Sequence, residues 1–125
     1  MVIERAQESL RAAELCLEER LVNSAASRAY YAMFQSVHVA LEAAGVRRAR
    51  WSHPALQATF TTELIYRRGL YSRTLRDHLS IGLRVRHAAD YGADGVSSTV
   101  ANRMVRRAAT FVSAVHEGTG RGPRR

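Results

Sequence analysis

Residue types that bind phosphate and move protons gather in one short stretch near residue 87, with the sequence LRVRHAADY. The stretch contains Arg84, Arg86, His87, Asp90 and Tyr91. RNA cleavage without a metal ion needs a cation at the scissile phosphate and a group that takes the proton of the 2′-hydroxyl. Arg84 or Arg86 can supply the cation, and His87 is the nearby side chain that titrates near neutral pH.

A helix through this stretch places Arg84, His87 and Tyr91 on one face, since they are three and four positions apart. Arg86 and Asp90 are four apart and can form an ion pair. The plainer interpretation is a salt bridge at a helix end beside a half-buried tyrosine. We name the five chemistry-bearing residues as candidate catalytic residues and leave this alternative open.

The helix that must position them is predicted at residues 23–45. Apolar side chains recur there at helical spacing, and they are Tyr30, Phe34, Val37, Leu41 and Ala44. A neighbouring stripe of small residues allows a second helix to approach closely. Arg28 and Tyr31 lie on a third, polar stripe. If this helix packs against the one that ends at Tyr91, Arg28 and Tyr31 join the candidate residues in a phosphate-binding cleft. Alternatively, Arg28 pairs with Asp90 and only ties the two helices together.

The remaining elements are also predicted to be helices, because no segment shows sustained period-two alternation. Asn23 or Ser24 is the expected N-cap of the central helix, and Gly45 stands where a left-handed residue ends it. The expected fold is an all-α bundle of four long helices plus an additional helix. The predicted helices run over residues 2–19, 23–45, 52–69, 72–91 and from 97 or 98 to about 117. Ser52 and Ser72 are expected to cap the third and fourth helices, and Ser97 or Ser98 to start the last one. The expected apolar positions of the fourth helix are Leu75, Leu79 and Leu83.

The charge of the chain favours an acidic partner or nucleic acid. The 125 residues carry a formal net charge of +8, and all 19 basic residues are arginines, whose planar guanidinium suits phosphate. The first 19 residues are acidic overall, so the later helices carry the positive field. The basic connector VRRARW adds Arg47, Arg48 and Arg50 to Arg28 and Tyr31 as candidate nucleic-acid-binding residues.

Several other classes of protein lack support. The five histidines form no metal-binding spacing, and neither a glycine-rich phosphate loop nor a Gly-x-Ser-x-Gly elbow is present. We therefore expect no metal and no cofactor. The lone Cys16 allows no disulfide framework, and the longest uncharged run is too short to span a bilayer. These features predict a soluble, cytoplasmic protein that is not bound to a membrane.

Two motifs resemble the HEPN domains, which are small bacterial and archaeal helical bundles. Residues 27–34, SRAYYAMF, resemble the S-R-x-Y-Y-A-x-F signature, and residues 86–91, RHAADY, resemble the R-x-x-A-D-Y end of the fourth helix. Ser52-His53 and residues 68–71, RGLY, also fit. The resemblance covers residues 1–117, which leaves residues 118–125 as an expected flexible basic tail.

The resemblance implies a homodimer, often encoded beside a minimal nucleotidyltransferase in a toxin–antitoxin pair. It also implies that the chain is a candidate for metal-independent RNA cleavage, which many HEPN proteins perform with an Arg-x4–6-His motif near the dimer seam. This sequence departs from that motif, since Ala89 and Tyr91 occupy the fifth positions after Arg84 and Arg86. The literal match from Arg73 to His78 lies at the start of the helix, and we interpret it as chance. In some related toxins a tyrosine two residues beyond the histidine of the motif is adenylylated by the partner, and Tyr91 would stand in its place.

Three functions stay open at this point. The first is a HEPN-type RNA- or nucleotide-associated domain paired with a nucleotidyltransferase in a toxin–antitoxin or defence module, with RNA cleavage unresolved. The second is a catalytically silent module that docks the transferase or nucleic acid. The third is a structural homodimerising bundle. His53 and His38 are interpreted as structural, His53 as a donor beside a helix cap and His38 as a packed interface residue.

Overall fold

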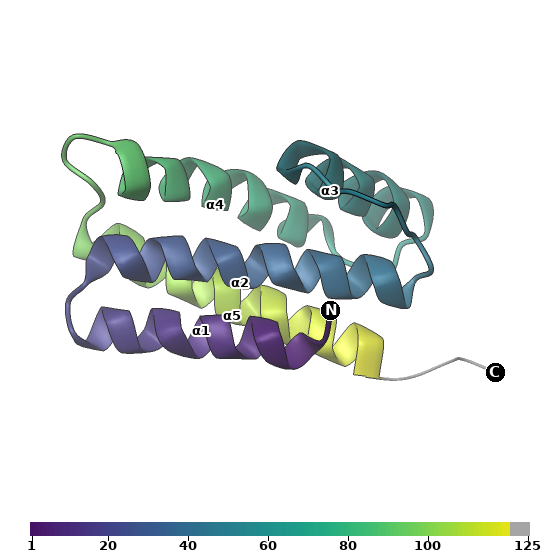
Figure 1. The fold of residues 1–125 in the computed structure, drawn as a ribbon, viewed down its shortest axis with the longest axis horizontal. Helices are drawn as coiled ribbons and strands as arrows, with labels where there is room; N and C mark the ends of the chain where they lie inside the picture. The colour runs from purple at the N-terminus through teal and green to yellow at the C-terminus, as the bar shows by residue number, and fades with distance from the viewer. Residues whose placement is uncertain (121–125) are drawn as a thin grey trace.

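A computed structural model describes residues 1–120 of the protein. The fold is a bundle of helices (Figure 1). Four long helices lie side by side: α1 (Ile3–Glu18), α2 (Val22–Ala43), α4 (Arg73–Tyr91) and α5 (Ser98–Gly120). The short α3 (His53–Thr59) and the π-helix η1 (Phe60–Arg67) cover one end of the bundle. All regular elements within residues 1–120 are helical, which confirms the predicted all-α bundle of four long helices with one more.

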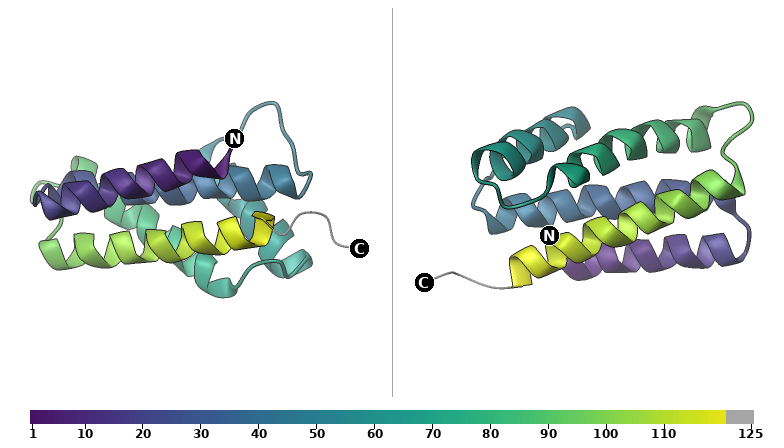
Figure 2. Two further views of the ribbon diagram at one scale, coloured as in Figure 1. Left: turned by 90° about the horizontal axis from the view of Figure 1, so that it is seen from below. Right: turned by 180° about the vertical axis from the view of Figure 1, so that it is seen from behind.

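Helix α2 is the centre of the bundle. It contacts α1, α4 and α5, and the views in Figure 2 show α1 and α5 on one side of it with α4 on another. The predicted apolar stripe of α2 is buried at Tyr30, Phe34, Val37 and Leu41. The small residues beside it allow the close approach of α1 and α5, as where Ala32 of α2 meets Ala6 and Val112.

The connection between α1 and α2 is tighter than the sequence predicts. Arg20 adopts a left-handed conformation with φ of 62°, and the amide of Leu21 donates to the carbonyl of Cys16, so α1 ends in a Schellman motif. The next helix begins almost at once, with Leu21 at its N-cap and no side-chain cap. The prediction that Asn23 or Ser24 caps α2 is therefore wrong, because both residues lie inside the first turn. At the other end, Gly45 has φ of 79°, as predicted.

Helix α4 approaches α2 and α5 closely at Gly82. A Cβ atom at this position would lie 2.6 Å from Cε of Met33 and 3.1 Å from Cε of Met104, so the absence of a side chain brings α4 against both helices. Leu75 and Leu79 are buried as predicted, but Leu83 is 38% exposed. The predicted stripe of α4 is wrong at Leu83, because the helix makes its inward contact through the adjacent glycine instead.

The third predicted helix is split. Ser52 caps α3 by accepting a hydrogen bond from the amide of Ala55, as predicted, but the chain widens into a π-helix at Phe60. Because a π-helix repeats at i→i+5, Phe60 and Ile65 come near the same face, and both are buried together with Leu64. The predicted single helix over residues 52–69 therefore has the right extent and the wrong internal geometry.

The caps of the last two helices are as predicted. The hydroxyl oxygen of Ser72 accepts from the amide of Thr74, and that of Ser97 accepts from the amide of Val100. Helix α5 continues to Gly120, three residues beyond the predicted domain boundary at residue 117. The part of the predicted tail that follows, residues 121–125, lies outside the described residues.

Candidate functional site: a groove between α2 and α4

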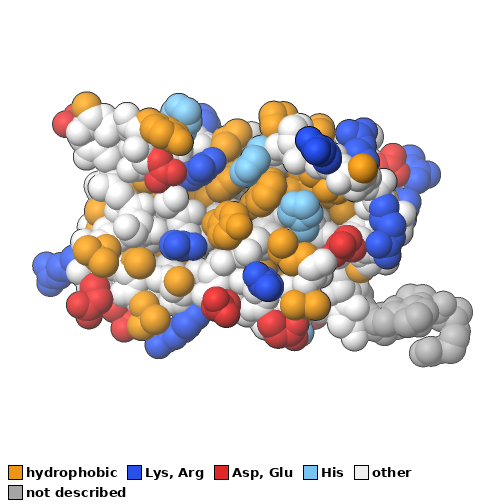
Figure 3. Space-filling model, viewed as in Figure 1, with side chains coloured by type: hydrophobic (Ala, Val, Ile, Leu, Met, Phe, Trp, Pro, Cys, Tyr) orange, Lys and Arg blue, Asp and Glu red, His pale blue; other side chains and the backbone are white. Residues whose placement is uncertain are grey.

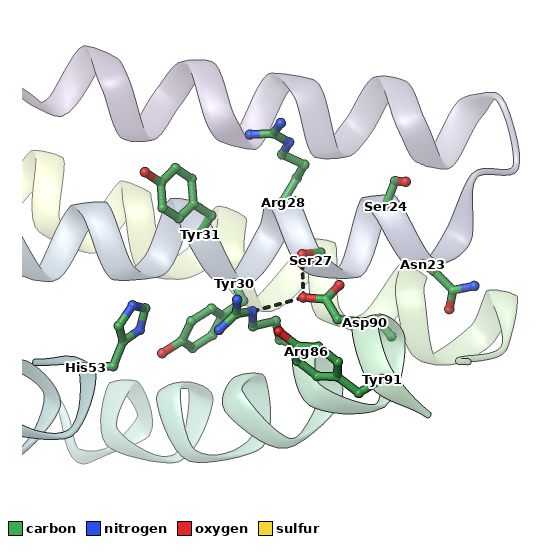
Figure 4. A pocket seen from close by; sticks show the side chains of 11 residues that line it. Asn23, Ser24, Ser27, Arg28, Tyr30, Tyr31, His53, Arg86, Asp90 and Tyr91 are labelled. Atoms are coloured by element: carbon green, nitrogen blue, oxygen red, sulfur yellow. Dashed lines mark hydrogen bonds and ion pairs between the residues drawn. The ribbon is translucent and has the colours of Figure 1, made fainter. Parts of the chain in front are cut away.

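An open groove of about 780 Å³ lies where the first half of α2 meets the last turn of α4 and the start of α3 (Figure 4). In the space-filling view, apolar side chains and histidines gather over this seam, with arginines beside them (Figure 3). The residues that line the groove are Asn23, Ser24, Ser27, Arg28, Tyr30, Tyr31, His53, Arg86, Ala89, Asp90 and Tyr91. Five of the sequence-predicted residues, Arg28, Tyr31, Arg86, Asp90 and Tyr91, therefore meet in one place.

A carboxylate joins the two helices at the floor of the groove. The hydroxyl of Ser27 on α2 donates to Oδ2 of Asp90 over 3.4 Å, and Nε of Arg86 donates to the same oxygen over 3.1 Å (Figure 4). The predicted alternative, in which Arg28 pairs with Asp90, is wrong because Ser27 faces α4 and Arg28 does not. Arg28 is consequently available for another partner.

The Arg86 side chain is held in place from two sides. Besides its ion pair with Asp90, its guanidinium lies 5.8 Å from the centre of the Tyr30 ring. The Tyr30 hydroxyl is itself fixed by a hydrogen bond from the side-chain amide of Gln57 on α3. Burial raises the pKa of Tyr30, while Arg86 and Gln57 act in the opposite direction, so the phenol stays protonated at neutral pH. Arg86 thus presents a positioned cation to the groove.

Arg28 and Tyr31 form the other side of the groove (Figure 4). Tyr31 is 43% exposed and stacks on Phe34 with ring centres 6.5 Å apart. Arg28 makes no hydrogen bond or ion pair with any residue of the described chain, 1–120. An exposed guanidinium without an acidic partner, opposite Arg86, is suited to bind an anion.

His53 is the functional candidate that sequence reasoning missed. Its ring stacks on that of Phe34, with centres 4.0 Å apart and planes 10° apart, and it lines the groove next to Tyr30. Burial lowers the pKa of His53, and the nearby positive charge of Arg86 lowers it further. The imidazole is therefore uncharged at neutral pH and can accept a proton. No spacing rule identifies His53, because it reaches the groove through the fold of the connector; its place in the Ser52-His53 element of the family resemblance was the available signal.

Other predicted site residues lie outside the groove. Arg84 lines a separate, smaller groove of about 370 Å³ with Val96 and Val100, so the predicted cleft shared with Arg86 is wrong for Arg84. His87 is exposed and packs its ring 5.0 Å from that of Tyr91 without lining the groove. Arg84 and Arg86 are two positions apart in the sequence, but they project from different flanks of α4 and therefore line different grooves.

The three connector arginines, Arg47, Arg48 and Arg50, also do not line the groove. Arg48 instead lies 5.0 Å from the centre of the Trp51 ring. The arginine and the histidine of the literal Arg-x4-His match, Arg73 and His78, have different neighbours. Arg73 lies over the Tyr66 ring, whereas His78 is half-buried near Arg107, and burial followed by that charge lowers the pKa of His78. Neither residue lines the groove between α2 and α4.

No group of three or more His, Cys, Asp or Glu side chains in residues 1–120 is arranged to hold a metal ion. None of the helices in the same residues combines the length and apolar character that crossing a bilayer requires. The groove itself offers two guanidinium groups, an uncharged imidazole, two exposed phenols and three small polar side chains. Such a set can bind phosphate, stack on flat rings and accept a proton.

The fold and the groove define an all-α bundle with a basic, aromatic groove beside its central helix. The family model of the HEPN domain matches residues 1–118, so the chain belongs to the HEPN domain family. The comparison with curated proteins gave no match.

Proposed function

We propose that this HEPN domain binds RNA in the groove between α2 and α4, as one half of a toxin–antitoxin or defence module paired with a minimal nucleotidyltransferase. The observation that carries the proposal is the placement of Arg28 and Arg86 on opposite sides of one groove, with Tyr31 and Tyr91 beside them. Guanidinium groups bind phosphate oxygens, and exposed aromatic rings stack on unpaired bases. The single carboxylate in the groove, Asp90, is already engaged by Arg86 and Ser27.

RNA binding is tested by fluorescence anisotropy with a labelled single-stranded RNA. Combining Arg28→Ala with Arg86→Ala removes both cations of the groove, and we expect at least a tenfold loss of affinity with a shallower salt dependence. The matched control is Arg84→Ala with Arg103→Ala, which removes the same charge from α4 and α5 outside the groove. Equal losses for the two double variants would mean that the groove is not the binding site.

Cleavage of the bound RNA is a second candidate function, and His53 favours it. An uncharged imidazole beside two guanidinium groups can take the proton of a 2′-hydroxyl while the cations stabilise the charge on phosphorus oxygens. The test incubates the protein with labelled tRNA in EDTA. Cleavage that His53→Gln abolishes and His87→Gln preserves supports this assignment. If binding occurs without cleavage by the wild-type protein, the domain is the catalytically silent module.

Tyr91 is the proposed site of modification by the transferase. It is 70% exposed at the edge of the groove, so a second enzyme can reach it. In the reaction, the phenolic oxygen attacks the α-phosphate of ATP, the bond to the β-phosphate breaks, pyrophosphate leaves, and the phenol proton passes to a base or to solvent. Because the adenylyl group adds bulk and negative charge beside Arg28 and Arg86, we expect it to block RNA binding.

Modification and assembly have direct readouts. Incubation with the transferase and ATP should raise the mass of the chain by one adenylyl group, and Tyr91→Phe should prevent the gain. An unmodified wild-type chain would remove this part of the proposal. We also propose, from family membership, that the chain forms a homodimer, which sedimentation equilibrium measures. A dimer that neither binds RNA nor receives the adenylyl group would leave the structural role.

A further inference from the structure

A second, shallower groove lies between the α3–η1 segment and α4. Its volume is about 410 Å³, and its polar lining consists of Gln57, Thr61, Thr62, Arg76 and Ser80. These side chains offer one guanidinium, one amide and three hydroxyls, all of which donate hydrogen bonds. No acidic residue lines this groove, so its polar surface is suited to an anionic chain.

The two grooves meet at a hydrogen bond. Tyr30 lines the first groove, Gln57 lines the second, and the Gln57 side-chain amide donates to the Tyr30 hydroxyl. Both grooves also have α4 as one wall, with Arg86 in the first and Arg76 in the second. A ligand that follows α4 from its last turn toward its first turn therefore passes from one groove into the other.

The second groove leads to a cluster of one tyrosine and two arginines. The guanidinium groups of Arg73 and Arg76 lie 5.4 Å and 5.8 Å from the centre of the Tyr66 ring, and Arg76 also donates to the Tyr66 hydroxyl. Tyr66 is 47% exposed. Arg76 has an acidic neighbour in Asp77 at 3.1 Å, whereas Arg73 forms no ion pair within the residues that the structure describes. An exposed ring flanked by cations is suited to bind bases and phosphates together.

Arginines are numerous at this end of the molecule. Figure 3 shows blue side chains gathered around the end where α3 lies. Arg68 of this end donates to the carbonyl of Ala44, so the C-terminal end of α2 and the connector that follows it lie close to η1. The connector carries Arg47, Arg48 and Arg50. The positive field therefore continues beyond the Tyr66 cluster and would attract the same anionic ligand.

We propose that the second groove and the Tyr66–Arg73–Arg76 cluster form an extended binding surface that carries a single-stranded RNA away from the first groove. This inference rests on the proposed function, because the same strand occupies both grooves. Arg76 and Asp90 are fourteen positions apart on α4, which corresponds to about 21 Å along a helix. A stacked strand rises about 3.4 Å per nucleotide, so the surface spans roughly six nucleotides.

The test compares the affinities of labelled single-stranded RNAs of about three and about ten nucleotides. The longer RNA reaches both grooves, and the shorter one fills only the first. The double variant Arg73→Gln with Arg76→Gln should bind the longer RNA at least tenfold more weakly and the shorter RNA within twofold of wild type. Loss of two phosphate contacts should also lower the slope of log affinity against log salt by about 1.4 for the longer RNA.

Three further variants make the result specific. Arg103→Gln with Arg106→Gln removes the same charge from α5 and should leave both affinities within twofold of wild type. Tyr66→Phe should retain most of the affinity for the longer RNA, and Tyr66→Ala should reduce it, because stacking needs the ring and not the hydroxyl. Circular dichroism of each variant confirms that it is folded before its affinity is compared.

Each of the remaining outcomes would overturn part or all of the proposed RNA-binding surface. Equal affinity of wild type and the Arg73–Arg76 double variant for the longer RNA would overturn the extended surface and leave the first groove in place. The same result accompanied by loss of transferase binding would assign this surface to a protein partner instead. The Arg73–Arg76 double variant could instead lose affinity for the longer RNA while the Arg28–Arg86 variant binds both RNAs as wild type does. That result would overturn the proposed first groove. A wild-type protein that binds neither RNA would overturn both.

Discussion

The two sides of α2 make different kinds of contact with their neighbours. Toward α1 and α5, the helix packs small and apolar side chains, such as Ala32 against Ala6 and Val112, and the buried hydroxyl of Ser9 donates to Gln35 over 2.6 Å. Toward α4 and α3, the helix contributes Ser27 and Tyr30 to polar links with Asp90, Arg86 and Gln57. The first side is closed, whereas the second contains the groove, which is open to solvent.

This difference separates stability from binding. Burial of apolar surface provides most of the favourable free energy of folding, so the closed side and the core that continues into η1 should dominate stability. The polar links on the open side are partly exposed and contribute little to stability, but they fix the positions of the side chains that line the groove. Substitutions on the two sides should therefore change different measurements.

The largest effect is expected from Phe111→Ala on α5. Phe111 is fully buried, and its ring lies 5.6 Å from that of Phe60 in η1. Removing the ring should lower the free energy of unfolding by about 3–5 kcal/mol, as measured by urea denaturation. Ser113→Ala, at an exposed position on the same helix, should change it by less than about 0.5 kcal/mol. A loss below about 1 kcal/mol for Phe111→Ala would contradict the assignment of this core as the source of stability.

On the open side, Arg86→Ala should weaken RNA binding at least tenfold, because a charge-assisted contact to phosphate contributes about 1.5–3 kcal/mol. Its effect on stability should be below about 1 kcal/mol, since the ion pair with Asp90 is partly exposed. Arg84→Ala, on the other flank of α4, should leave RNA affinity within twofold. A larger loss of RNA affinity for Arg84→Ala than for Arg86→Ala in anisotropy measurements would contradict the assignment of RNA binding to the open side.

Asn23 has two roles, because it lines the groove and also holds the chain after α4. Its side-chain oxygen accepts a hydrogen bond from the amide of Val96 over 2.8 Å. Asn23→Ala should lower the free energy of unfolding by about 1 kcal/mol in urea denaturation. Ser24→Ala, at the next and exposed position, should be nearly neutral. Equal effects of the two variants would mean that the bond to Val96 does not stabilise the fold.

The turn between α1 and α2 belongs to the closed side and should respond in the opposite direction. Arg20 holds a left-handed conformation that glycine adopts without steric cost, so Arg20→Gly should raise the free energy of unfolding by about 0.5–1 kcal/mol. Glu19→Gly, where φ is −88°, should lower it. Thermal unfolding followed by circular dichroism measures both, and a loss of stability in Arg20→Gly would contradict the conformation of this turn.

The smallest effect is a pH dependence that arises from three histidines. Burial lowers the pKa of His53, His38 and His78 from the ordinary value of 6.5, and of the three only His53 lines the groove. Below pH 6.5 the unfolded chain therefore binds more protons than the folded chain. The contribution of these histidines to the free energy of unfolding is complete above that pH and is lost as the pH decreases toward the folded pKa values. Urea midpoints measured from pH 7.5 to 5.5 should decrease, and His53→Gln should flatten the decrease. A midpoint that rises as the pH falls would contradict the direction of these shifts.

The sequence predicted most of the scaffold because helical periodicity records which side chains are buried. The stripe of Tyr30, Phe34, Val37 and Leu41 identified the central helix, and glycine or serine marked several helix ends. Periodicity assumes a regular α-helix, so it missed the π-helix at Phe60. It also missed the close approach at Gly82, because glycine has no side chain to enter an apolar pattern.

The site was predicted less completely because it combines segments that are far apart in the chain. Spacing within α4 grouped Arg84 with His87 and Tyr91, but only the packing of α4 against α2 and α5 decides which flank faces the groove. Ser27, one position before the predicted Arg28, makes the bond to Asp90. His53 enters the groove because the connector after α2 returns to it, and no local pattern carries that information.

The most direct test of the account is an NMR titration of the isotopically labelled protein with a short single-stranded RNA, which requires no substitution. Occupation of the groove predicts that the largest shift changes fall on residues of its two sides, including Arg28, Tyr31, Arg86 and Tyr91. Changes concentrated instead on the outward arginines of α5, Arg103 and Arg106, with the groove residues unaffected, would contradict the claim that RNA binds between α2 and α4.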